Sequence, residues 1–182
     1  MIKLIVCIDL KGNIGKNNDL LYHMKEDMEF FKEKTKRQEI LMGLNTWYSL
    51  PNKPLKDRLN IVVGFDREEL NEIKEELNEI KTEYYPLLTY TDLRCAIDEY
   101  IDDVEYINNP NDLYIIGGAS IYNQVIDMDI IDEAYVTIVN DIVEDADVSI
   151  NIDLLRSQLY REEILKSFKY KDKDVKIVRY YK

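Results

Sequence analysis

Apolar runs of five to seven residues alternate with amphipathic segments along most of the chain. The runs IKLIVCI, EILMG, LNIVVG, DLYIIGG and EAYVTIV are rich in Ile, Val, Leu and Tyr, which is typical of buried strands. Helical spacing of apolar positions lies between them, over residues 25–34, 45–50, 68–81, 92–101 and 119–126. This alternation predicts an α/β fold with a largely parallel sheet covered by helices on both faces.

Two further stretches add an edge and an extra helix to this pattern. The tail from Phe168, FKYKDKDVKIVRYY, alternates on both sides of KDKD and predicts an antiparallel hairpin that closes one edge of the sheet. The stretch LNEIKEELNEIK places four apolar side chains on one stripe, those of Leu70, Ile73, Leu77 and Ile80. We expect an extra amphipathic helix around residues 68–81 that lies on the domain, with a partner-binding helix as the alternative.

One acidic residue interrupts the apolar side of the first predicted helix. In LLYHMKEDMEFFK, the side chains of Met24, Met28 and Phe31 share one stripe, and Asp27 falls on it. A carboxylate that faces an apolar interior costs several kcal/mol unless a partner satisfies it. Asp27 is therefore a candidate functional residue whose partner has to be found.

Composition narrows the class of protein. The 182 residues are 46% hydrophobic, which fits one globular domain over residues 1–182, and the net charge of −12 argues against binding nucleic acid or an anionic membrane. The N-terminal apolar run is too short for a signal peptide or a membrane span, so a cytoplasmic protein is expected. Cys7 and Cys95 lie far apart without metal-ligand spacing, and His23 is the single histidine, so we expect two core cysteines and no metal site.

The best candidates for ligand binding are two junctions where a buried strand runs through glycine into a short helix. They are ILMG followed by LNTWYSL, and LYIIGG followed by ASIYNQVI. Glycine allows close approach to the backbone, and a helix N-terminus offers unpaired N–H groups, so together the junctions could hold a diphosphate. The chain has no GxGxxG, GxxxxGK[ST] or HExxH motif. A buried acid, two such turns and many aromatic residues suit a flat heteroaromatic substrate and a redox cofactor.

These motifs occur in the order and spacing of the dihydrofolate reductase family, which the chain resembles from Met1 to its C-terminal hairpin. The matching segments are Asn13-Ile14-Gly15, LLYHMKEDMEFFK, MGLNTWYSLPNKPLKDRLNIVV and YIIGGASIY. The resemblance implies a single domain with a central, mostly parallel sheet of eight strands. It also implies reduction of dihydrofolate to tetrahydrofolate by hydride transfer from NADPH, for one-carbon metabolism and thymidylate and purine synthesis.

The resemblance also implies roles for individual residues. Asp27 would bind the amino-pyrimidine edge of the pterin with Thr137 bonded to it, Tyr122 would lie beside the nicotinamide, and Arg58 would pair with the glutamate carboxylate of folate. The walls of the substrate pocket would be Ile5, Cys7, Met28, Phe31, Leu50, Leu55 and Ile116. The cofactor would meet Gly43, Leu44, Asn45 and Thr46 on one side and Gly117, Gly118, Ala119, Ser120 and Ile121 on the other, with a cis peptide expected at Gly117-Gly118. The lid over the nicotinamide would be formed by Ile14, Gly15, Leu20 and Tyr22. Cys7, at the end of the first strand, would also cover the nicotinamide.

The chain departs from the family pattern at the lid and at the adenosine end of the cofactor. Leu21 and Lys25 stand where the family often has proline, which predicts a looser lid. Leu44 stands where the family commonly has the arginine for the 2′-phosphate of NADPH, and Gly64-Phe65-Asp66-Arg67 replaces the usual serine or threonine pair. Arg67 could bind the 2′-phosphate in place of that arginine. Alternatively, Asp66 could bind a free ribose hydroxyl, which would weaken the preference for NADPH over NADH. We expect NADPH, with NADH as the alternative.

Three functions fit the sequence. The first is a monomeric dihydrofolate reductase that binds dihydrofolate and antifolates. The second is a reductase of the same fold that acts on another heterocycle, such as the ribosylamino-pyrimidine of riboflavin synthesis. The third is a binding or structural protein that has kept the fold and lost turnover. Asp27, Arg58 and TWYSLPNKPLKDR favour the first.

Overall fold

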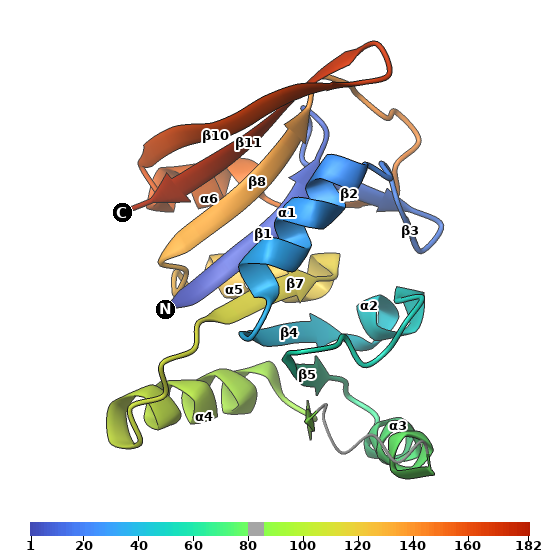
Figure 1. The fold of residues 1–182 in the computed structure, drawn as a ribbon, viewed down its shortest axis with the longest axis vertical. Helices are drawn as coiled ribbons and strands as arrows, with labels where there is room; N and C mark the ends of the chain where they lie inside the picture. Colours follow the sequence, from blue (N-terminus) through green and yellow to red (C-terminus); the bar gives the residue numbers. More distant parts are fainter. Residues whose placement is uncertain (80–85) are drawn as a thin grey trace.

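The core of the molecule is a single twisted sheet of eight strands in the order β10-β11-β8-β1-β7-β4-β5-β6 (Figure 1). The computed structural model describes residues 1–79 and 86–182. The parallel strands are β1 (Ile2–Ile8), β4 (Glu39–Gly43), β5 (Leu59–Val63), β6 (Leu87–Tyr90), β7 (Leu113–Gly117) and β8 (Glu133–Val139). The antiparallel hairpin of β10 (Arg161–Tyr170) and β11 (Lys173–Tyr181) joins the edge at β8. The predicted α/β fold with a mostly parallel sheet is confirmed.

Six helices of the described residues cover the sheet. They are α1 (Lys25–Thr35), α2 (Leu44–Ser49), α3 (Arg67–Glu79), α4 (Leu93–Tyr106), α5 (Ala119–Asp127) and α6 (Ile152–Gln158). A small second sheet contains β2 (Asn13–Lys16), β3 (Asp19–Leu20) and β9 (Val148–Ser149). The sequence pattern did not reveal this sheet, strand β6 or helix α6, and it ended α4 five residues early.

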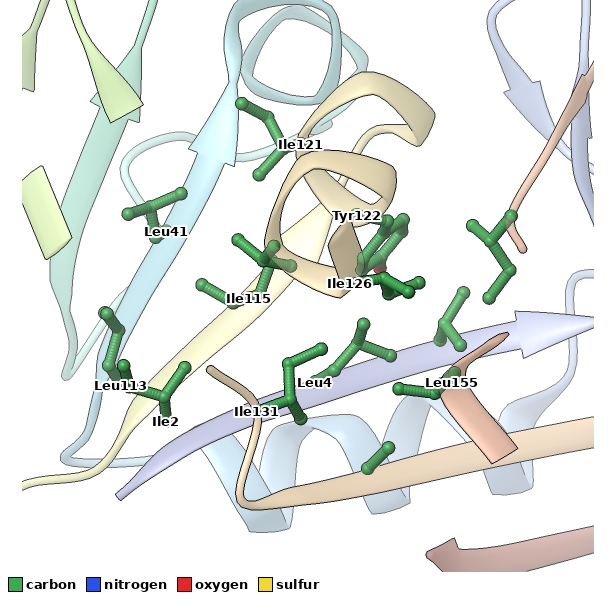
Figure 2. Packing of buried hydrophobic residues seen from close by; sticks show 14 of the residues in the cluster. Ile2, Leu4, Leu41, Leu113, Ile115, Ile121, Tyr122, Ile126, Ile131 and Leu155 are labelled. Atoms are coloured by element: carbon green, nitrogen blue, oxygen red, sulfur yellow. The ribbon is translucent and has the colours of Figure 1, made fainter. Parts of the chain in front are cut away.

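Two apolar layers hold the helices on opposite faces of the sheet. One layer joins α4, α5 and α6 to inward-facing residues of β1, β4 and β7. Figure 2 shows Ile121, Tyr122 and Ile126 of α5 in this layer, together with Leu4 and Ile115 of the strands. The other layer joins α1, α2 and α3 to the alternate residues of the same strands. Because the strands are covered on both faces, their sequences are continuous apolar runs.

Helix α3 packs on the domain through the first half of its expected stripe. The side chains of Leu70 and Ile73 are each 2% exposed and belong to the layer that contains α1 and α2. The second half of the stripe, Leu77 and Ile80, lies outside the described side chains. The described half supports a helix that lies on the domain.

Two smaller expectations are corrected by the packing. Cys95 is exposed on α4, because the helix turns Leu93, Ala96 and Ile97 toward the sheet instead. Met28 shares the expected apolar stripe with the buried Met24, but its own side chain is 45% exposed. None of the described helices is long and apolar enough to cross a membrane.

Candidate active site

Asp27 meets a hydroxyl of the neighbouring sheet. The hydroxyl of Thr137, on β8, donates to Asp27 Oδ1 at 2.5 Å, and Thr137 is 2% exposed. Its register partner on β1 is Cys7, which brings that thiol beside the pair. Within the described residues no lysine or arginine pairs with Asp27. The acid on the apolar stripe thus has one neutral donor and no countercharge.

Burial shifts the pKa values of Asp27 and of two neighbouring groups. Burial raises the pKa of the Asp27 carboxyl above its ordinary value, and the hydrogen bond from Thr137 opposes part of that rise. Burial, assisted by the Asp27 charge, also raises the pKa of the Cys7 thiol and of the Tyr122 phenol. Cys7, Asp27 and Tyr122 therefore form one weakly solvated group. The Tyr122 hydroxyl donates to the carbonyl oxygen of Ile5 at 2.7 Å, so this hydroxyl fixes the ring and is not free for a ligand.

Removing the Thr137 hydroxyl should raise the pKa of Asp27 further. In Thr137→Val the shape is nearly kept, but the carboxylate loses the donor that favours its charged form. A carboxyl-carbon NMR titration would measure the shift, and the alkaline limb of the kcat/KM profile should move to higher pH with it if Asp27 supplies a proton. Thr89→Val, on strand β6, is the matched control. An unchanged or lowered Asp27 pKa in Thr137→Val would contradict the assignment.

The two glycine junctions meet at the carboxyl edge of the sheet. Gly43 ends β4, Gly117 ends β7, and a cis peptide joins Gly117 to Gly118, as expected. A Cβ atom on Gly117 would lie 3.2 Å from Thr46 Oγ1, and one on Gly118 would lie 3.3 Å from the same atom. Gly117 also has φ +122°, a conformation that favours glycine. The first turn of α2 therefore faces the glycine pair at a distance that leaves no room for side chains.

The helices at this edge share an unusual feature of their N-termini. The N-cap residues of α1, α2 and α5 are Met24, Gly43 and Gly118, and none accepts a hydrogen bond with its side chain. By contrast, α3, α4 and α6 are capped by side chains, those of Asp66, Asp92 and Asn151. Side-chain caps stabilise ordinary helix starts. Their absence where the two junctions meet leaves N–H groups and positive dipole ends open to an anion.

Five of the expected substrate walls belong to the apolar layer on the α1 side of the sheet. Ile5 and Ile116 are buried, and Phe31, Leu50 and Leu55 are partly buried against the same layer. Arg58 is 8% exposed and its guanidinium lies 5.8 Å from the centre of the Phe31 ring. Its Nε has no hydrogen-bond partner among the described residues. Arg58 also borders a cavity of about 400 Å³ whose lining includes Lys36 and Arg37.

The expected lid is formed by β2, β3 and the segment that enters α1. Ile14 is buried, Leu20 is 51% exposed, and Tyr22 is 7% exposed. The Tyr22 hydroxyl donates to Asp141 at 3.2 Å, so it points to the loop after β8 and not to Asp27. Sequence reasoning missed this loop. The acidic run DIVEDAD, residues 141–147, was the sequence feature that could have pointed to this loop, which lies opposite the lid.

The position of Leu44 shows why an arginine is absent there. Its side chain lies over Gly64, where a Cβ atom would be 2.3 Å from Leu44 Cδ1 and 3.3 Å from Leu70 Cδ2. Leu44 therefore packs into the layer that α3 adds to the domain. Asp66 accepts hydrogen bonds from the backbone N–H groups of Glu68 and Glu69, so it caps α3. Leu44 is half-buried and carries no charge, so its side chain offers no partner for a phosphate.

The chain is similar in sequence to known proteins. A family model described as dihydrofolate reductase matches residues 1–182. A dihydrofolate reductase of Buchnera aphidicola is 33% identical over 145 residues, which are 74% of this chain and 77% of that relative. A putative dihydrofolate reductase of Caenorhabditis elegans is 30% identical over 143 residues, 74% of this chain and 69% of the relative. One from Ureaplasma parvum is 48% identical over 62 residues, 34% of this chain and 40% of the relative. The chain belongs to the dihydrofolate reductase family of oxidoreductases.

Proposed function

We propose that this protein reduces 7,8-dihydrofolate to 5,6,7,8-tetrahydrofolate with NADPH, and so supplies one-carbon metabolism. The observation that carries the proposal is Asp27, a half-buried carboxyl with a raised pKa whose one described partner is the hydroxyl of Thr137. A group of this kind costs stability unless a ligand uses it. An amino-pyrimidine edge presents two parallel N–H donors, which match the two oxygens of a carboxylate.

Asp27 would have two tasks in the reaction. Its carboxylate would orient the pterin by accepting from the ring N–H and the exocyclic amine. Its raised pKa would also help to retain a proton near neutral pH, for transfer toward the pterin nitrogen that is protonated. Thr137 would hold the carboxyl in place, and the apolar neighbours Ile5, Phe31 and Ile116 would exclude water from the ring.

Arg58 would bind the other end of the substrate. Its guanidinium lies 5.8 Å from the centre of the Phe31 ring, and Phe31 is one turn further along α1 than Asp27. Its planar guanidinium suits a carboxylate, and its buried Nε has no partner among the described residues. Antifolates with a diaminopyrimidine ring would use the Asp27 end of the same pocket.

The glycine junctions fit the cofactor. The close approach of Gly117 and Gly118 to Thr46 and the uncapped starts of α2 and α5 would hold the diphosphate through backbone N–H groups and the Thr46 hydroxyl. Asn45, Ala119, Ser120 and Ile121 lie in the same first turns. Tyr122 would support the nicotinamide with its ring face, while Cys7, Ile14 and Gly15 would close its other side. When bound, the reduced nicotinamide supplies the hydride.

A cavity beside α3, lined by two cations and the single carboxylate of Asp92, supports NADPH over NADH. The cavity has a volume of about 260 Å³ and lies between α3 and the start of α4, with Arg67 and Lys74 in its lining. It opens next to Gly64 and Tyr90, at the same edge as the two junctions, since Gly64 N–H bonds the Tyr90 carbonyl at 3.0 Å. Two cations there would compensate for Leu44 by binding a phosphate. Asp66 caps α3, which weakens its case as a ribose ligand.

The double variant Arg67→Ala/Lys74→Ala should lose about tenfold in affinity for NADPH, which corresponds to about 1.4 kcal/mol, and should keep its affinity for NADH. Calorimetric titration of each cofactor measures both values without turnover. Arg94→Ala, an exposed arginine on α4 outside the cavity lining, is the control. An equal loss for both cofactors, or no loss for either, would contradict the phosphate assignment.

One assay separates the candidate functions. NADPH oxidation by the native chain is followed with dihydrofolate, and then with an antifolate added. Turnover that the antifolate inhibits supports the proposal. Antifolate binding without turnover indicates a binding protein that keeps the fold, and oxidation with a ribosylamino-pyrimidine but not with dihydrofolate indicates the other reductase.

A further inference from the structure

The lid is fastened at Tyr22, immediately before the helix that carries Asp27. The Tyr22 ring is buried in a small cluster with Met24, Val139 and Val175. It also meets the Tyr170 ring edge to face, with centroids 6.3 Å apart. Met24 is the N-cap residue of α1 and is 1% exposed, so this cluster fixes the start of α1. The position of Tyr22 is thereby linked to the position of Asp27, five residues along the chain.

The hydroxyl of Tyr22 donates to the carboxylate of Asp141, which also accepts a hydrogen bond from Lys173. Asp141 Oδ2 accepts from the Tyr22 hydroxyl at 3.2 Å, and Asp141 Oδ1 accepts from Lys173 Nζ at 2.8 Å. Lys173 is the first residue of β11, at the turn of the C-terminal hairpin. The chain Tyr22–Asp141–Lys173 therefore joins three segments that are more than 30 residues apart in sequence. Both hydrogen bonds involve charged groups, which makes them stronger than neutral ones.

The backbone around Asp141 is fixed on both sides. Its carbonyl oxygen accepts from Leu10 N–H at 3.0 Å, and its own N–H donates to Val139 at 2.8 Å. The preceding Asn140 N–H donates to the Asp174 carbonyl at 2.8 Å, beside Lys173. A carboxylate on such a backbone can orient a neighbour, because moving it would break main-chain hydrogen bonds to Leu10, after β1, and to the hairpin.

We propose that Asp141, held by Lys173, is a positioning residue that fixes Tyr22 and with it the lid and the first turn of α1. The hydrogen bond supplies the restraint that Leu21 and Lys25 do not, since these residues stand where the family often has proline. This proposal opposes the expectation that the lid of the native chain is loose, and hydrogen exchange of the native lid decides between the two. The effect on catalysis rests on the proposed function, whereas the effect on the lid does not.

The first test measures backbone hydrogen exchange of residues 15–24 without ligand. Tyr22→Phe, Asp141→Ala and Lys173→Met should each raise exchange there by about tenfold, with α5 unchanged as an internal reference. Lys169→Met removes an exposed ion pair with Asp174 on the same hairpin, and it should leave exchange of the lid unchanged. Native protection no greater than in Asp141→Ala would overturn the proposal.

The second test asks whether Tyr22 and Asp141 act as one unit. The double variant Tyr22→Phe/Asp141→Ala should be no worse than Asp141→Ala alone, in exchange and in KM for dihydrofolate. KM should rise about threefold to tenfold in Asp141→Ala and in Lys173→Met, while kcat of these two variants changes less than twofold. Additive losses, or losses that follow the melting temperature instead of lid exchange, would overturn the proposal. If the native chain does not reduce dihydrofolate, the proposed function fails and the exchange data alone decide on the lid.

Discussion

Replacing Asp27 with asparagine is expected to lower turnover of dihydrofolate by about 10²- to 10⁴-fold, the range typical of a lost general acid. Asparagine keeps the shape and can still accept the Thr137 hydrogen bond. It loses the proton and presents only one acceptor to the amino-pyrimidine edge. Steady-state kinetics of native chain and variant would measure the loss. Glu29→Gln, an exposed acid on the same helix, is the matched control and should retain activity. Activity within tenfold of native would contradict the role of Asp27.

The same substitution should stabilise the folded chain at neutral pH. Burial raises the pKa of Asp27 in the folded state, so the folded state holds this proton more tightly than the unfolded chain does. The contribution of the carboxyl to stability is then present below its unfolded pKa and is lost as pH rises through the raised folded pKa. The unfolding free energy of Asp27→Asn should therefore rise relative to that of the native chain as pH increases between these two pKa values. Urea unfolding at several pH values measures this difference. A variant less stable than native at pH 7 would contradict the burial argument.

Removing the carboxylate of Asp9 is expected to cost about 3 to 5 kcal/mol of unfolding free energy, because several buried donors lose their acceptor at once. Asp9 is fully buried after β1. Its oxygens accept from the backbone N–H groups of Lys11, Asn13 and Val143 and from the Asn13 side chain, at 2.7 to 2.9 Å. These bonds hold the turn into β2 and the start of the acidic loop opposite the lid.

Urea unfolding of Asp9→Ala measures this loss. Asp9→Asn should lie between the native chain and Asp9→Ala, because the amide oxygen can still accept from two of the donors. Asp98→Ala, on the exposed face of α4, is the control and should change stability by less than about 0.5 kcal/mol. A loss below about 1 kcal/mol in Asp9→Ala would show that the donors find other acceptors.

Asp9 and Asp27 show what the sequence could and could not reveal. Asp27 was visible because its helix has a regular apolar stripe that the acid interrupts. Asp9 follows an apolar strand, where an acid is typical of an exposed turn, so nothing local indicated that backbone N–H groups from Val143 and elsewhere would surround it. Local periodicity reveals a misplaced charge within one element, whereas a network between distant segments depends on the tertiary fold.

The limited reach of local sequence patterns also explains which strands were predicted and which were missed. The five apolar runs became β1, β4, β5, β7 and β8 because buried parallel strands are marked by composition alone. Strands β2, β3 and β9 have four residues or fewer and few apolar side chains, so their pairing follows from where the lid and the acidic loop meet. Tyr22 was assigned to the lid from the family pattern. Its link to Asp141 and Lys173 appears only when three distant segments are placed together.

The central claim is that the carboxyl of Asp27 is buried for a ligand with an amino-pyrimidine edge. Calorimetric titration of a 2,4-diaminopyrimidine antifolate into the native chain and into Asp27→Asn tests it most directly, since no turnover is needed. We predict saturable binding to the native chain and an affinity at least about 100-fold lower in the variant, equal to about 3 kcal/mol. Equal affinity for the two proteins would contradict the account.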